Sequence, residues 1–317
     1  MDWRPLNGPA TAAERATLKR RVHRYFDGQS VLEVDTPSLS ASAVSDPHLH
    51  SLTVEDRKHS TTPLYLHTSP EFAMKRLLAA GFPDIYSVSR VYRGGEVGRR
   101  HQPEFTMIEW YRVGMQESGI IDDTLALIGA VLDRETPTVQ KTYRDAFVDA
   151  IGLDPLTESI DGIRTAADFD NDLAASLGDR RQDWLDVLFA DRVATTFAAD
   201  TLTVINAYPA DQAALAQLDP EDPTVALRFE VFFGSMELAN GFVELGDAQE
   251  LRRRFEGDLE IRRDKHQSVL PLDERFLAAM QSGLPACSGV ALGFERLHMV
   301  AAGTTDIRDV LLFDHEG

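Results

Sequence analysis

A chain of 317 residues is long enough for one large hydrophobic core or two modest ones, and its 43% hydrophobic and 26% charged residues are typical of a globular protein. It has no apolar run of about 18 residues and no signal-peptide pattern at its start, so we expect a cytoplasmic protein that does not enter a membrane. The formal net charge of −19 argues against polynucleotide binding, which depends on a basic surface, and suits small cationic ligands better. The single cysteine, Cys287, excludes an internal disulfide and a zinc site built from several cysteines.

The first predicted helix covers residues 11–28. Thr11 and Glu14 have the spacing of a capping box, and apolar residues recur at helical intervals up to a glycine that ends the pattern. A short strand over residues 31–34 follows, and Pro37 comes after it. Helix, strand and proline in this order occur in many α/β proteins, so this unit alone identifies nothing.

A second helix is predicted to begin at residues 68–71, with Ser69 as its N-cap and Pro70 in its first turn. Glu71 is an acid in the first turn, where it stabilises the helix dipole.

Residues 84–112 predict two antiparallel strands around a basic loop. The first strand, residues 85–93, is rich in β-branched and aromatic side chains and ends at two glycines. The second alternates with period two, which places Phe105, Glu109 and Tyr111 on one face.

Basic side chains gather at the loop of this hairpin: Arg93, Arg99, Arg100 and His101. Guanidinium groups bind phosphates and an aromatic ring stacks on a base, so the hairpin suits a nucleoside triphosphate. The alternative is an exposed hairpin with a solvated basic loop.

The following region, residues 114–222, is predicted to be mostly helical, with helices over 120–132, 143–151 and 183–197 and a strand over 202–207. Residues 228–245 then predict two strands around a glycine turn, and residues 247–264 predict a charged helix. Three carboxylates stand among the aromatic residues of the two strands: Glu230, Glu237 and Glu244. Each needs a cation or hydrogen-bond donors there, which nearby arginines or a ligand could supply.

Three stretches in order resemble the sequence motifs of class II aminoacyl-tRNA synthetases in their lysine-specific form. The unit ending at Pro37 resembles motif 1, in which it forms a dimer interface. Tyr92-Arg93 with residues 101–111 resembles motif 2, and residues 288–297, SGVALGFERL, resemble motif 3. Residues 307–313 resemble the closing strand of that fold.

This resemblance implies an α+β fold, the class II catalytic core, with an antiparallel β-sheet flanked by helices. It implies one catalytic domain over residues 11–317, with the insertion of residues 114–222 between motifs 2 and 3.

The resemblance also implies an ATP site with Mg²⁺. Arg93 would bridge the substrate carboxylate and the α-phosphate, and Phe105 and Arg296 would enclose the adenine. Glu230 and Glu237 would hold Mg²⁺ on the phosphates, since hard cations take carboxylate oxygens. The further residues expected to contact ATP are Glu96, Arg100, His101, Glu237 and Gly293.

A lysine-type substrate pocket is implied between motifs 2 and 3. Glu71 would hold the amino group near the carboxyl end of the substrate, and Asn240 would bind the carboxylate. Glu244, with Tyr111, would take the distal ammonium. The remaining residues of the expected pocket are Ser69, Glu109 and Ala291.

The motif 1 resemblance begins near residue 11, so we expect no N-terminal OB-fold that reads an anticodon, and no tRNA partner. The resemblance is to lysyl-tRNA synthetase paralogues that attach (R)-β-lysine to a lysine of elongation factor P. Those proteins resemble one another in having alanine at the position of Ala291, where lysyl-tRNA synthetases usually have glycine. The added methyl would push back an α-amine and leave room for a β-amine. The implied partners are elongation factor P, (R)-β-lysine or lysine, and a second copy of the chain in a homodimer.

One position departs from the family pattern. Arg-Asn-Glu is usual in motif 2, whereas this chain has Arg93-Gly94-Gly95 followed by Glu96, which could replace the glutamate if the glycines let it turn inward. Two alternatives therefore stay open: a ligase that activates α-lysine for another acceptor, and a non-catalytic paralogue that acts as a regulatory or binding subunit.

Overall fold

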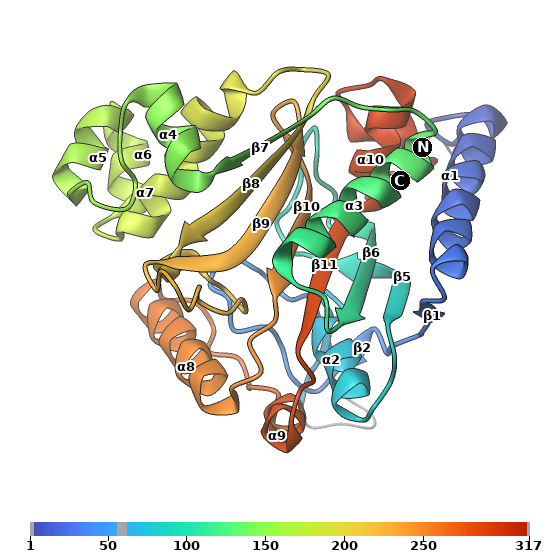
Figure 1. Ribbon diagram of the computed structural model, residues 1–317, viewed down its shortest axis with the longest axis horizontal. Helices are drawn as coiled ribbons and strands as arrows, with labels where there is room; N and C mark the ends of the chain where they lie inside the picture. The colour runs from blue at the N-terminus through green and yellow to red at the C-terminus, as the bar shows by residue number, and fades with distance from the viewer. Residues whose placement is uncertain (1–2, 56–61, 316–317) are drawn as a thin grey trace. The chain divides into compact units, whose positions relative to one another are not determined.

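The computed structural model describes residues 3–55 and 62–315 (Figure 1). The chain divides into two compact units. The first consists of Met1–Arg134 and Glu244–Gly317, and the second of Glu135–Val243. None of the helices in the described ranges combines the length and the apolarity needed to cross a membrane.

The first unit contains four strands of a sheet: β1 (Leu32–Glu33), β5 (Ile85–Tyr92), β6 (Glu104–Val113) and β11 (Cys287–Gly293). They lie in the order β1, β5, β6, β11. β1 runs parallel to β5, and the other two pairs are antiparallel. β6 is the central strand of this unit, and seven consecutive residues of it, from Thr106 to Arg112, are buried.

Six α-helices belong to the first unit: α1 (Pro9–Gly28), α2 (Glu71–Ala79), α3 (Glu117–Leu132), α8 (Ala248–Asp264), α9 (Glu274–Ser282) and α10 (Phe294–Ala302). α3 packs against both α1 and α10, as Figure 1 shows. α9 packs against α2 and α8 through aromatic rings: Phe276 stacks on Phe72 of α2 at 4.3 Å between centroids and is tilted against Phe255 of α8 at 6.1 Å. A small sheet completes the unit: β2 (Leu39–Ser40), β4 (Leu64–Leu66) and β3 (Thr53–Val54).

The second unit contains the strands β7 (Thr138–Thr142), β8 (Leu202–Pro209), β9 (Val225–Phe233) and β10 (Met236–Val243). Its helices are α4 (Tyr143–Ile151), α5 (Ile160–Ala167), α6 (Asn171–Leu177) and α7 (Arg181–Leu188). β7 runs parallel to β8, and β8, β9 and β10 are antiparallel in turn. An aromatic core joins the helices to β8 and β9, with Tyr143 stacked on Phe189 at 5.2 Å between centroids.

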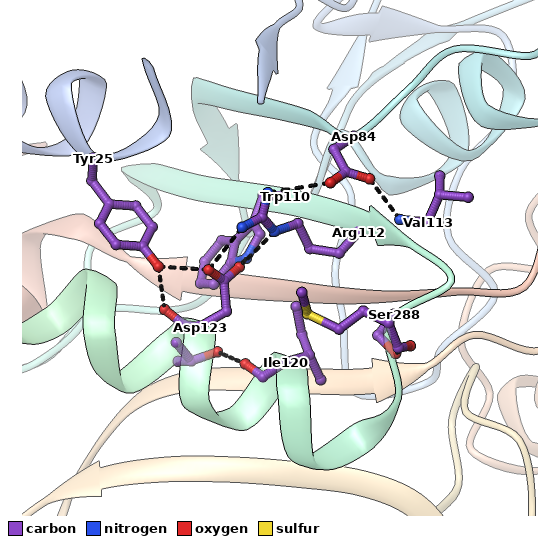
Figure 2. Close-up of polar contacts among 10 residues, drawn as sticks. Tyr25, Asp84, Trp110, Arg112, Val113, Ile120, Asp123 and Ser288 are labelled. Carbon is purple, nitrogen blue, oxygen red and sulfur yellow. Dashed lines mark hydrogen bonds and ion pairs between the residues drawn. The ribbon is translucent and has the colours of Figure 1, made fainter. Parts of the chain in front are cut away.

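A buried hydrogen-bond network ties β6 to α3 and α1 (Figure 2). The carboxylate of Asp123 on α3 accepts from Nε of Arg112 at 2.9 Å, from Nε1 of Trp110 at 3.0 Å and from the hydroxyl of Tyr25 at 2.5 Å. Arg112 also forms an ion pair with Asp84, at 3.2 Å, just before β5. Trp110 and Arg112 share one face of β6, so this network fixes which face points toward α3.

The predicted fold class is confirmed, with parallel pairing added at β1–β5 and β7–β8. The predicted helix over residues 143–151 is α4. The single domain over residues 11–317 stays a prediction. Within residues 114–222, predicted to be mostly helical, the structure has α3 to α7 together with β7 and β8.

Two local predictions are wrong. Residues 307–313 do not form a strand: Ile307–Val310 is a 3₁₀ helix, because the side chain of Asp306 accepts from the backbone N–H of Arg308 and starts a turn. The capping box at residue 11 is also absent. α1 begins earlier, at Pro9, whose fixed φ suits a first helical turn, and no side chain caps it.

We predict that Asp123→Ala lowers the free energy of unfolding by about 3–5 kcal/mol, because a buried arginine loses its partner while the Trp110 and Tyr25 donors are left unpaired. Urea unfolding measures the change. The matched control is Asp122→Ala, since Asp122 is the exposed neighbour on the same helix and its loss should cost less than about 0.5 kcal/mol. Equal effects of the two substitutions would contradict a structural role for the network.

Candidate active site

Three carboxylates from three segments of the first unit come together around one lysine. Glu71 lies in the first turn of α2, Glu109 on β6, and Glu244 in the loop that leads into α8. The Oε2 atom of Glu109 accepts from Oγ of Ser69 at 2.7 Å, and its Oε1 atom accepts from the hydroxyl of Tyr111 at 2.7 Å. We call this group, with Lys75, the acidic pocket: Ser69, Glu71, Lys75, Glu109, Tyr111 and Glu244.

Lys75 on α2 is fully buried in this pocket. Its Nζ atom lies 2.6 Å from Oε1 of Glu71 and 2.5 Å from Oε2 of Glu244. Burial alone would lower the pKa of this lysine, but Glu244 and Glu71 outweigh that effect and raise it. Lys75 therefore stays charged throughout the neutral range.

The carboxylates are less easily ionised than ordinary ones. Burial raises the pKa of Glu109 to about 7, and the neighbouring charge of Glu71 adds to the effect. Burial also raises the pKa of Glu244 to about 8, although Lys75 opposes the shift. Three acids share one internal cation, so the pocket favours a ligand that brings further positive charge.

Gly289 and Ala291 on β11 form the floor of the pocket. Gly289 pairs with Tyr111 and Ala291 pairs with Glu109 in the register of β11 and β6. A Cβ atom at Gly289 would lie 2.4 Å from the Tyr111 ring and 2.5 Å from Oε1 of Glu244. Only glycine leaves room for these two side chains to meet there, and the methyl of Ala291 lies two residues along on the same face.

Arg93 lies directly after β5 and stacks on Phe105, with its guanidinium carbon 5.2 Å from the ring centroid. Its Nε atom donates to the carbonyl of Thr68 at 3.3 Å. Gly95 has φ +80°, a left-handed conformation that turns the chain back, and Glu96 lies 3.8 Å from Arg93. Glu96 thus lies beside Arg93, and its role as a replacement for the motif 2 glutamate stays a prediction.

A cluster of positive charge lies beyond this turn. Arg296 is in the first turn of α10, and its NH2 atom is 2.6 Å from Nε2 of His101. The pKa of Arg100 is lowered by burial and by the nearby charges of Arg296 and Arg99. Like charges held this close favour a polyanionic ligand. We call Arg99, Arg100, His101 and Arg296 the basic cluster.

Glu295 ties the helix that carries Arg296 to β6. Its Oε2 atom accepts from the backbone N–H of Thr106 at 2.8 Å, and its Oε1 atom accepts from Arg15 of α1 at 2.8 Å. The backbone pairing of β6 with β11 ends at Met107 and Gly293. Beyond this point the side chain of Glu295, instead of a backbone carbonyl, accepts the hydrogen bond from β6. The contact fixes Arg296 relative to Phe105, the residue before Thr106.

In the second unit, Glu230 is already engaged by protein donors. Its Oε1 atom accepts from Arg228 at 2.6 Å and its Oε2 atom from the hydroxyl of Tyr208 at 2.7 Å. Its pKa is nevertheless raised by burial, and the charge of Glu237 contributes. This is the arginine pairing that the sequence had left open for Glu230.

Two carboxylates that act on one another are the right donors for Mg²⁺, which takes one or two protein carboxylates together with substrate phosphates. Among residues 3–55 and 62–315, no group of three or more acidic, histidine or cysteine side chains could hold a metal alone. The assignment of Glu230 and Glu237 to Mg²⁺ stays a prediction, because both oxygens of Glu230 accept hydrogen bonds from protein donors in this structure. Asn240 pairs with Glu230 across the strands, and its Oδ1 atom is buried without a hydrogen-bond partner. Such an atom suits a polar ligand.

Sequence comparisons assign the family. The family model for class II tRNA synthetases (D, K and N) matches residues 1–317. The chain belongs to the class II tRNA synthetase family. It is 40% identical over 316 residues to an elongation factor P–(R)-β-lysine ligase of Pseudoalteromonas translucida, covering 98% of this chain and 97% of the relative. The ligase of the same name from Proteus mirabilis is 42% identical with the same coverage, and that of Haemophilus influenzae is 40% identical over 314 residues.

Within this synthetase fold, the structure brings the substrate residues predicted in the first unit into the acidic pocket. It also joins Arg93 to Phe105 and Glu96, and Arg296 to Arg100 and His101. Pro37 lines a cavity of about 130 Å³ together with Ser69 and Glu71 of the acidic pocket. Its place in a dimer interface, like the ligand assigned to each residue, stays a prediction.

Three residues of the site escaped the sequence analysis: Lys75, Gly289 and Glu295. A signal existed for Lys75, because Glu71 and Lys75 have the i, i+4 spacing of a helical ion pair and Lys75 lies between the apolar Met74 and Leu78. Gly289 and Glu295 depend on which strand pairs with β11, which the sequence does not specify.

We predict that Gly289→Ala lowers the free energy of unfolding by about 1–3 kcal/mol, because the new methyl must displace Tyr111 and Glu244. Gly257→Ala on α8 is the matched control. No atom lies within 4 Å of its added Cβ, so the change should stabilise that helix by about 0.5–1 kcal/mol. Urea unfolding of both variants measures the difference, and an unchanged stability of Gly289→Ala would contradict the close approach.

Proposed function

We propose that this protein is an ATP-dependent, AMP-forming ligase that activates (R)-β-lysine and joins it to the side-chain amine of a lysine on elongation factor P. The observation that carries the proposal is the position of the acidic pocket. Its residues Glu109 and Tyr111 lie on β6, the strand that also carries Phe105. β11, which forms the floor of the pocket, ends at Gly293, and α10 with Arg296 follows directly. One pair of strands thus presents carboxylates suited to an amine and basic groups suited to phosphates. The names and extent of the similar ligases support the same substrate and acceptor.

In the first step, a carboxylate oxygen of β-lysine attacks the α-phosphorus of ATP, and the bond to the β-phosphate breaks to release pyrophosphate. Arg93 bridges the attacking carboxylate and the α-phosphate, where negative charge builds up in the transition state. Phe105 and Arg296 hold the adenine, with Gly293 leaving room beside it. The basic cluster holds the terminal phosphates, and Glu96 takes the role of the usual motif 2 glutamate.

Positioning supplies most of the rate enhancement in this scheme. Glu71 binds the amine nearer the carboxyl end, Glu244 and Tyr111 bind the distal ammonium, and Asn240 binds the carboxylate. Glu109 and Ser69 hold the pocket together. Glu230 and Glu237 would hold Mg²⁺, which would supply positive charge beside the departing pyrophosphate.

In the second step, the amine nitrogen of the acceptor lysine attacks the carbonyl carbon of the adenylate. An amide forms, AMP leaves, and the amine loses a proton. We further propose that the protein is a cytoplasmic homodimer with Pro37 at its interface. It does not use tRNA as a substrate, because its acceptor is a translation factor.

The proposal predicts ATP–pyrophosphate exchange that depends on (R)-β-lysine and is weaker with (S)-β-lysine or α-lysine. Arg296→Ala should reduce the exchange by about 10²-fold or more, because it removes a charge from the reacting nucleotide. Arg263→Ala, which removes an exposed arginine of α8, is the matched control and should leave the rate unchanged. A parent protein that exchanges with none of the three amino acids would overturn the proposal and favour a non-catalytic paralogue.

The α-lysine-activating ligase is distinguished by Ala291→Gly. Ala291 lies opposite Glu109, so removing its methyl opens space beside the pocket carboxylate. We predict that the use of α-lysine rises about tenfold or more relative to β-lysine, the typical value of one methyl group in a tight pocket. The measurement is the ratio of the exchange rates with α-lysine and β-lysine, which does not depend on how much of the variant is active. A ratio that does not change would favour the α-lysine enzyme.

A further inference from the structure

Lys75 is a charged side chain with no exposed surface. Met74 and Leu78 of α2 pack with Ile85, Tyr111 and Cys287 in one buried cluster. Removing an ammonium from water is costly unless it is closely paired. Lys75 meets this condition with two carboxylates, at 2.6 Å and 2.5 Å.

The two partners of Lys75 are both residues expected to bind substrate amines. Glu71 is one helical turn away, whereas Glu244 is far away in sequence and is held by a backbone hydrogen bond to Cys287 of β11. The Oε2 atom of Glu244 meets Lys75, while its Oε1 atom lies over Gly289 beside the Tyr111 ring. Lys75 therefore determines which oxygen of Glu244 faces that side of the pocket.

The charges around Lys75 come from each element that packs on it. Glu71 is on α2 itself, Glu109 and Tyr111 are on β6, Cys287 is on β11, and Glu244 precedes α8. α9 meets α2 through the stacked rings of Phe72 and Phe276. Three carboxylates face one ammonium, so without Lys75 they would repel one another.

We propose that Lys75 is a positioning residue of the substrate pocket, whose ammonium holds the carboxylates of Glu71 and Glu244 in the orientation in which they bind the amines of the substrate. This inference rests on the proposed function, because it concerns the same pocket. It adds a resident cation that the substrate does not displace. The pocket then carries one fixed positive charge and uses the remaining negative charge for a diamine.

The role has a defined pH dependence. Glu109 and Glu244 have pKa values raised to about 7 and about 8, so below these values they are increasingly protonated and bind an ammonium less well. Alkyl amines stay charged to about pH 10. The KM for β-lysine should therefore fall as the pH rises from about 6 to about 8.5 and then level off.

Lys75→Met keeps the length of the side chain and removes its charge. Glu109 and Glu244 then lose the ammonium whose charge lowers their pKa, so the pH range over which KM falls moves up by about one pH unit or more. At pH 7 the KM should rise about tenfold, while kcat at saturating β-lysine changes less, because the reacting phosphate is bound by other residues. Steady-state pyrophosphate exchange between about pH 6 and pH 9 gives both constants. Lys75→Arg retains the charge, so the pH range over which its KM falls should stay near that of the parent protein.

Lys141→Met is the matched control, since it removes a partly exposed lysine that pairs with Asp149 on the surface, and it should change neither constant. If Lys75→Met does not fold, Lys75→Met with Glu71→Gln removes one acid along with the ammonium and should recover the folded protein, as measured by urea unfolding. Failure of the double variant to gain stability over the single one would overturn the charge role.

The inference and the proposed function fail differently. A parent protein without lysine-dependent exchange defeats the proposed function. If the parent protein catalyses pyrophosphate exchange but the KM of Lys75→Met has the same pH profile as that of the parent, the inference is wrong and the proposed function stands. A loss of kcat with an unchanged pH profile of KM would show that Lys75 only supports the fold.

Discussion

The alternation of side chains along β6 is the constraint on which the first unit depends. Trp110 and Arg112 are fixed toward α3 by Asp123, so the residues between and before them, Tyr111 and Glu109, must face the other way. A shift of one residue would place a carboxylate against the apolar contacts of α3 and remove the partner of Asp123, which makes such a slip very costly. The network of Figure 2 therefore sets the orientation of the acidic pocket, although it has no contact with a substrate.

The pocket itself works against stability. Burying Glu109 and Glu244 raises their pKa values to about 7 and about 8, which means that folding makes these groups harder to ionise. Since their folded-state pKa values lie above the ordinary value of about 4.3, their ionisation favours the unfolded chain, and their contribution to stability falls as the pH rises from about 4.3 to about 8. Substrate ammonium groups would reverse this cost, so the same burial that destabilises the empty pocket increases its preference for a cation.

Sequence patterns predicted those parts of the site that depend on local order. Period two in β6 placed Glu109 and Tyr111 together. The sequence left open whether the two glycines after Arg93 let Glu96 turn inward, and in the structure Glu96 lies 3.8 Å from Arg93. The prediction of a closing strand over residues 307–313 was wrong because the side chain of Asp306 starts a 3₁₀ turn in a stretch with the composition of a strand. Gly289 and Glu295 could not be found from local order, since their importance arises only when β11 lies beside β6.

Lys75 illustrates why charged residues are difficult to interpret from sequence. An i, i+4 pair of Glu71 and Lys75 usually marks the exposed side of a helix, where it contributes a few tenths of a kcal/mol. Here a third charge, Glu244, arrives from a distant segment and turns the same pair into a buried triad. Glu295 is similar, because its hydrogen-bond partners, Arg15 of α1 and the backbone of β6, come close to it only when the chain is folded. The geometry of this site is therefore set by ion pairs between elements that are far apart in sequence, and motif residues acquire their orientation from partners outside the motifs.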